Sequence, residues 1–200
     1  MTEEINSILS FWFGNSGDQN TIIQTQSELW WGKSKQSDDI IKQRFGGIYQ
    51  SAVNDELNAW LQSAQGQLAL ILLLDQFSRV IHRDTPAAFS QDVKASAITI
   101  EGVGKNIDKS LSPLERVFYY MPLEHAEDLE KQNQSVNLFG QLLLEAPEDL
   151  KEKFQNYLDF ANQHRLIIER FGRFPHRNKL LKRFSNAEEI AFLSEPGSSF

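Results

Sequence analysis

Three short segments place ionisable side chains beside apolar ones, and these residues could support chemistry. The first, residues 75–79, reads Asp-Gln-Phe-Ser-Arg and directly follows the apolar run 68–74. In a helix, Asp75 and Arg79 lie one turn apart on the same face. Burying charged groups costs free energy unless they are paired. We therefore expect Asp75, Gln76 and Arg79 to bind a ligand or, alternatively, to form an ion pair that joins this helix to its neighbour.

The second segment, residues 122–127, offers two carboxylates and an imidazole after a proline. Glu124, His125 and Glu127 are the candidate catalytic residues, because carboxylates and histidine serve as proton donors and acceptors in active sites. Alternatively, His125 is a hydrogen-bonded histidine at a helix end near Pro122. The segment lacks the His-Glu-x-x-His spacing that sets two ligands on one metal, so we expect no metal and no other cofactor.

The third segment is a basic and aromatic stretch, residues 170–178, which turns at Gly172 and Pro175. Guanidinium groups match the geometry of carboxylates and phosphates and keep their charge when they lose water. The candidate ligand-binding residues here are His164, Arg170, Arg173, His176 and Arg177. If the three segments meet in one pocket, they combine proton transfer with the binding of a small anion.

The elements that must position these segments have the pattern of helices. Ile5, Ile8 and Trp12 recur at helical spacing, and Gly14 is placed to end that helix. Apolar periodicity and capping signals predict further helices around 38–52, 60–61, 68–83, 86–102, 126–144, 147–171 and 187–193. The stretch 29–32 is compatible with a short helix or a packed loop.

Serine, threonine and proline mark several helix ends. Thr85 followed by Pro86 predicts a helix that starts with proline at its first position. Ser112 and Glu115 have the spacing of a capping box, which predicts another helix start. Pro122 predicts a kink or a restart, because proline inside a helix removes a hydrogen bond.

Antiparallel helix pairs joined by short turns, without the alternation of strands, predict an all-α fold. The chain has 200 residues, 40% hydrophobic and 24% charged, which is a globular balance. We expect one helical domain over residues 1–193 and a flexible tail over 194–200. The aromatic clusters 11–13 and 30–31 are expected mainly in the core, with a pocket wall as the alternative.

Charge and hydropathy exclude several classes of function. The formal net charge of −7 disfavours nucleic acid as a partner, and the basic run 173–183 is more typical of a solvated helix face. The apolar run 68–74 is shorter than the roughly 20 residues that span a bilayer, so no membrane partner is expected. Without cysteine or a visible secretory signal, the expected location is the cytoplasm.

Long motifs in all three segments resemble a bacterial family catalogued as domain of unknown function 924. These motifs are Asp-Gln-Phe-x-Arg at 75–79, Pro-Leu-Glu-His-x-Glu-Asp at 122–128 and Arg-Phe-Gly-Arg-Phe-Pro-His-Arg-Asn at 170–178. The similarity extends from Ile8 to Leu193, and it implies an all-helical fold of the tetratricopeptide-like superfamily but no function. Ser78, Val80 and Lys182 stand where the family typically has Pro, Asn and Gly, which bears on the geometry of two turns.

Two functional hypotheses follow. In the first, the arginines of the first and third segments hold a small anionic molecule, and Glu124, His125 and Glu127 supply acid–base, hydrolase-like chemistry. In the second, the chain is a tetratricopeptide-like module that binds a peptide or protein without catalysis, and the polar cluster is a structural ion-pair network.

Overall fold

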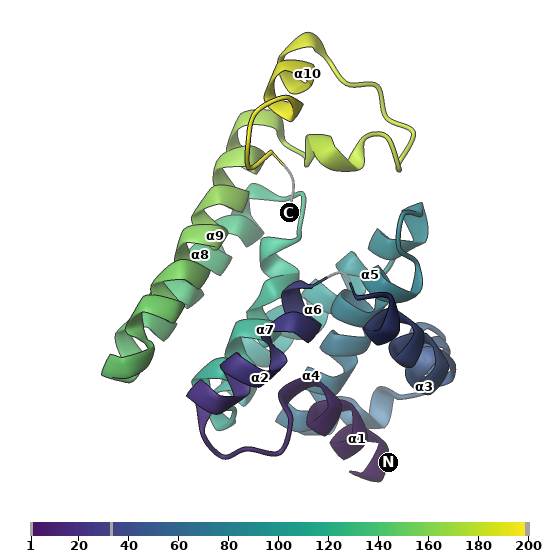
Figure 1. Ribbon diagram of the computed structural model, residues 1–200, viewed down its shortest axis with the longest axis vertical. Coiled ribbons are helices and arrows are strands. Elements are labelled where there is room, and N and C mark those ends of the chain that lie inside the picture. Colours follow the sequence, from purple (N-terminus) through teal and green to yellow (C-terminus); the bar gives the residue numbers. More distant parts are fainter. Residues whose placement is uncertain (1, 33, 199–200) are drawn as a thin grey trace.

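The computed structural model describes residues 2–32 and 34–198, and this part of the chain contains helices and no strand (Figure 1). In chain order the elements are α1 (Thr2–Phe13), α2 (Gln19–Trp31), α3 (Lys35–Val53), η1 (Asn58–Gln62), α4 (Ala64–Ile71), η2 (Leu72–Phe77), α5 (Ser78–Ile81), η3 (Pro86–Phe89), α6 (Asp92–Gly104), η4 (Ile107–Ser110), α7 (Pro113–Glu124), α8 (Leu129–Glu145), η5 (Glu148–Leu150), α9 (Lys151–Phe171), η6 (Pro175–Arg177) and α10 (Ala187–Leu193). The predicted all-α fold is confirmed, while the tetratricopeptide-like arrangement stays a prediction. Among the described helices, none is long and apolar enough to cross a membrane.

The central helix is formed by α4, η2 and α5, which follow one another without a break. It begins after Ser63, whose side chain accepts a hydrogen bond from the Gly66 amide. Within it, η2 is a π-helix, and the Ser78 amide donates to the carbonyl of Leu73, five residues earlier. Such wide turns are rare and occur often at functional sites. The predicted helix 68–83 is therefore confirmed, but its middle turn, which carries Asp75, is wider than an α-helix.

Aromatic side chains pack around Phe77, near the end of this helix. The Phe77 ring lies 5.4 Å from the Trp12 ring and 5.0 Å from the Phe45 ring. The rings of Phe118 and Trp30, 4.8 Å apart, belong to the same cluster. The Trp30 indole donates to the carbonyl of Trp12 at 2.9 Å, which satisfies its polar group inside the core. The core prediction for these clusters is thus confirmed except at Trp31, which is half exposed.

Two helix boundaries differ from the predictions. The helix expected over 86–102 is divided into η3 and α6, because the chain turns at residues 90–91 before Asp92 opens α6. Pro122 lies inside α7 near its end, and the next helix starts at Leu129 instead of Ala126. The reason is Asp128, whose carboxylate accepts from two amides of the first turn of α8. The capping box of Ser112 and Glu115 is confirmed.

The C-terminal arm, residues 172–198, forms a small separate unit at the end of α9, far from the N-terminus (Figure 1). It begins at Gly172, whose φ of 67° ends α9 as predicted. Phe174 packs on Ile167 and Ile168 of α9 in a minor apolar cluster. Part of the expected flexible tail is folded back, since the Ser198 hydroxyl donates to the Leu193 carbonyl, while residues 199–200 lie outside the described residues. The domain boundary at 193 stays a prediction.

Candidate functional site

Asp75 is the centre of the polar cluster. Its side chain is fully buried in the wide turn η2 and accepts from His125 Nδ1 at 2.7 Å, Arg79 Nη2 at 3.1 Å and Gln76 Nε2 at 2.5 Å. Burial alone would raise the pKa of this carboxyl, but the nearby His125 and Arg79 outweigh it and hold the pKa below its usual range. Asp75 is therefore a buried carboxylate that orients an imidazole and a guanidinium.

A chain of charges continues from Asp75 to the C-terminal arm. Arg79 Nη2 lies 3.1 Å from Asp92 Oδ1, and Asp92 Oδ2 lies 3.1 Å from Arg177 Nη1. The Arg177 guanidinium sits 4.5 Å from the ring centroids of both Phe89 and Phe174. Burial lowers the pKa of Arg177 to about 10, with the positive charge of Arg79 adding to the effect. The first and third segments thus meet through Asp92, which sequence reasoning missed.

The second segment supplies two adjacent carboxylate–histidine contacts. His125 caps the end of α7 and contacts Asp75, with 17% of its side chain exposed. Its neighbour Glu124 instead contacts His164 of α9, where Oε1 lies 2.9 Å from Nδ1 and both side chains are buried. The rings of His125 and His164 are 6.1 Å apart. Consecutive residues therefore belong to two separate pairs, one partly exposed and one sealed.

Glu127 and His176 belong to the contact between the arm and the body. Glu127 accepts from the Phe174 amide at 2.8 Å and from both Nη atoms of Arg183, at 2.6 and 2.8 Å. Burial alone would raise the pKa of Glu127, but the hydrogen bonds from Arg183 and from the Phe174 amide outweigh burial and lower the pKa. Burial also lowers the pKa of His176 to about 4, helped by Arg177. Glu127 thus serves as an acceptor that fixes the arm.

Arg170 and Arg173 point to a different part of the arm. Arg170 Nε lies 2.9 Å from Glu188, and Arg173 Nε lies 2.7 Å from Glu189, both in α10. Glu189 also accepts from the Asn186 amide in the capping box that starts α10. These two arginines hold α10 against the end of α9. The structure brings together the other candidate residues and leaves this pair apart from them.

A groove of about 420 Å³ runs along the polar cluster. One wall is formed by η3 and α6, another by the turn between α7 and α8, and the arm contributes Arg177 and Leu181. His125 and Arg177 line it, so both ends of the charge chain reach the groove. Lys131 also lines it and donates to the Ser96 hydroxyl at 3.1 Å. Sequence reasoning missed Lys131, which carries no motif signal.

Two cationic side chains, Lys131 and Arg177, line the groove. Within residues 2–32 and 34–198, the ammonium of Lys131 forms no ion pair with a carboxylate, whereas Arg177 pairs with Asp92 and its Nε is buried. The same described residues contain no group of three His, Asp or Glu that could hold a metal ion. The arrangement offers one oriented imidazole, one ammonium without a carboxylate partner and the positive charge of Arg177.

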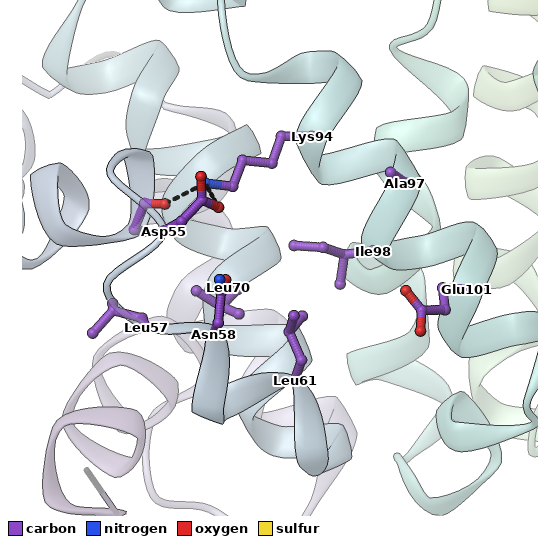
Figure 2. Close-up of a pocket in the computed structure, with 10 residues that line it drawn as sticks. Asp55, Leu57, Asn58, Leu61, Leu70, Lys94, Ala97, Ile98 and Glu101 are labelled. Carbon is purple, nitrogen blue, oxygen red and sulfur yellow. Dashed lines mark hydrogen bonds and ion pairs between the residues drawn. The ribbon is translucent and has the colours of Figure 1, made fainter.

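A second pocket, of about 190 Å³, lies between the end of α3, η1 and α6 (Figure 2). Lys94 reaches into it and contacts Asp55 at 2.6 Å and the carbonyls of Ala52 and Val53 at 2.6 and 3.2 Å. These three acceptors use the three donors of the ammonium, so Lys94 caps the end of α3. No histidine lines this pocket, and it offers less chemistry than the groove.

Comparisons with known proteins agree with the helical fold. A solved structure of a protein of unknown function from Agrobacterium tumefaciens is similar, with 33% sequence identity and a TM-score of 0.82. The similarity covers 96% of this chain and 98% of the other. No curated protein matches the sequence. The family described as "Bacterial protein of unknown function (DUF924)" matches residues 8–197. The chain therefore belongs to the DUF924 family of bacterial proteins.

Proposed function

We propose that the groove binds a small molecule with an anionic group and that His125 exchanges a proton with it. The observation that carries this proposal is the contact between Asp75 and His125 Nδ1 at 2.7 Å, with the imidazole in the groove wall. A carboxylate that accepts from Nδ1–H fixes the tautomer, so Nε2 carries the lone pair. In this tautomer His125 acts as a general base towards a molecule in the groove.

The anionic group is proposed to contact Lys131 and Arg177. Lys131 lines the groove and donates only to a neutral hydroxyl among the described residues. Arg177 donates from Nη1 to Asp92, and its guanidinium adds a second positive charge to the lining of the groove. Arg79, by contrast, is committed to Asp75 and Asp92. The binding of the anionic group, first expected of several arginines, is therefore proposed for Arg177 and Lys131.

A structural role for the charge chain is compatible with this proposal. Asp75, Arg79, Asp92 and Arg177 pair with one another, and they connect the central helix to the arm. Such a network fixes how helices are placed, and removing one member of a buried pair is strongly destabilising. The network keeps Asp75 ionised and rigid. It leaves Nε2 of His125 for chemistry, so one set of contacts serves both purposes.

Thermal unfolding in the presence of small carboxylates and phosphates tests the proposal. A molecule that binds the native state alone stabilises it by about 2.7 kcal/mol at one hundred times its Kd, which raises Tm. We expect Lys131→Gln to abolish this shift and His125→Asn to retain it. The matched control is Lys151→Gln, because Lys151 is an exposed lysine of α9 that pairs with Glu148.

Two results would contradict the proposal. An equal loss of the ligand-induced shift in Lys131→Gln and Lys151→Gln would place binding outside the groove. An absence of any shift across both ligand classes, together with repeated capture of one protein by the folded chain, would favour the peptide-binding module.

A further inference from the structure

We infer that the ligand of the groove is a monocarboxylic acid with an apolar body about the size of a short alkyl chain or a phenyl ring. This inference rests on the proposed function and names the class of molecule that the same site accepts. It depends on two features of the groove, its apolar wall and its balance of charges.

The apolar wall is built from both sides of the groove. Phe89 and Val93 contribute from η3 and α6, and Leu181 contributes from the C-terminal arm. Val93 is 76% exposed, which leaves an apolar side chain in water beside a concave surface. Covering such a surface with an apolar group is favourable. The groove therefore favours a ligand that has an apolar part as well as a charged group.

Phe89 is held in place as a fixed part of this wall. The guanidinium carbon of Arg177 lies 4.5 Å from its ring centroid, and that of Arg79 lies 5.3 Å away. Because both arginines are anchored on Asp92, the ring is restrained by contacts on two sides. A restrained aromatic ring binds an apolar body with little loss of side-chain entropy.

The charges in the groove favour a single negative charge on the ligand. Asp92, Glu127 and Asp128 line it together with Lys131 and Arg177. A carboxylate in the groove accepts a hydrogen bond from Lys131 Nζ and lies near the positive charge of Arg177. A dianionic phosphate would bring a second charge close to three carboxylates of the protein, and like charges repel strongly at short range. The groove is thus better matched to a carboxylate than to a phosphate.

Calorimetric titration with a homologous series tests the inference. The probes are acetate, butyrate, hexanoate and octanoate, with hexyl phosphate as the dianionic comparison. Burying one methylene contributes enough to change Kd by about fourfold, so Kd should fall by roughly that factor per added CH2 until the wall is covered. We expect hexyl phosphate to bind more weakly than hexanoate.

Two exposed aliphatic residues, Val93 and Leu144, provide a matched pair of variants. Val93→Ser removes apolar surface from the groove wall and should flatten the dependence of Kd on chain length, so that hexanoate loses more affinity than acetate. Leu144→Ser is the control, because Leu144 is 84% exposed on α8 and lies outside the groove. Both substitutions are at the surface, so neither should unfold the protein.

The outcomes separate the inference from the function on which it rests. If all four carboxylates bind with the same Kd and lose binding in Lys131→Gln, the apolar body is refuted and the anion site stands. If hexyl phosphate binds more tightly than hexanoate, the preference for a single charge is refuted. If no carboxylate or phosphate binds, the proposed function and the inference both fail.

Discussion

The two carboxylate–histidine pairs of this protein are alike in geometry and different in surroundings. Asp75 contacts Nδ1 of His125 at 2.7 Å, and Glu124 contacts Nδ1 of His164 at 2.9 Å. The side chains of Glu124 and His164 are both about 7% exposed, whereas the His125 ring reaches the groove. A histidine paired with a carboxylate is therefore not by itself a reactive site. What decides it is whether the second ring nitrogen has access to a ligand.

The surroundings of the sealed pair explain its structural character. The His164 ring packs edge-on against Phe174 at 5.6 Å, and its Nδ1 also lies 2.9 Å from the Phe160 carbonyl. Phe174 belongs to the C-terminal arm, so the arm covers this pair while it leaves His125 in the groove wall. The sealed pair is consistent with fixing α7 against α9.

The largest expected effect comes from removing the carboxylate of the open pair. Asp75→Asn leaves Arg79 without its fully buried partner, and we expect it to lower the free energy of unfolding by about 3–5 kcal/mol. Glu124→Gln removes the negative charge but keeps an oxygen that can accept from the imidazole, and we expect a smaller loss of about 1–3 kcal/mol. Urea-induced unfolding measures both values.

An exposed carboxylate provides the control for this pair of variants. Glu101 pairs with Lys105 at the surface of α6, and Glu101→Gln should change the free energy of unfolding by less than about 1 kcal/mol. If Glu124→Gln costs as much as Asp75→Asn, the sealed pair is as central to the fold as the open one. The two pairs would then differ in exposure but not in their contribution to the free energy of unfolding.

His176 of the arm is a third histidine in this region, and burial keeps its ring neutral near neutral pH. Its pKa is lowered to about 4 from an ordinary value of 6.5, first by burial and then by Arg177. Between pH 6.5 and 4 the unfolded chain binds more protons at this site than the folded one. The stability that the neutral ring contributes is present above pH 6.5 and is lost as the pH falls through this window.

The magnitude of this pH effect is about 2 kcal/mol after allowance for solvent screening. Urea unfolding at pH 7, 5.5 and 4 measures it, and His176→Gln should show a shallower decline over the same range. The control is His82→Gln, because His82 lies at the end of α5, where its ring packs 5.4 Å from the ring of Tyr49 in α3. An identical decline in the wild type and in His176→Gln would assign the effect to other groups.

Local signals in the sequence predicted much of the fold but only part of the candidate site. The capping box at Ser112 and the turn at Gly172 depend on neighbours within four residues, and both were predictable. The ion pair of Asp75 with Arg79 follows from helical spacing. Its continuation to Asp92 and Arg177 joins residues 85 positions apart, and no periodicity specifies such a contact.

Two further differences have physical causes in the sequence. The apolar run before Asp75 is buried on every side, so its pattern does not distinguish the wide turn η2 from an α-helix. Lys182, which stands where the resembled family typically has Gly, adopts a φ of 54°, a left-handed conformation that Gly occupies without strain. Lys182 therefore holds a backbone conformation that favours glycine. Arg170 and Arg173, expected to bind a ligand, instead pair with Glu188 and Glu189 of α10, and no local pattern predicted these contacts.

The smallest expected effect is on chemical reactivity, and it tests the comparison most directly. Diethyl pyrocarbonate modifies neutral imidazole nitrogens that it can reach, so we expect it to modify His125 several-fold faster than His164. Hexanoate bound in the groove should block the reagent from His125 and so slow its modification. The rate at His82 should not change, because His82 does not line the groove. Mass spectrometry of peptides measures all three rates. Equal modification of His125 and His164 would mean that the reagent reaches both histidines equally. Protection of His82 together with His125 would mean that hexanoate acts on the whole molecule and not at the groove.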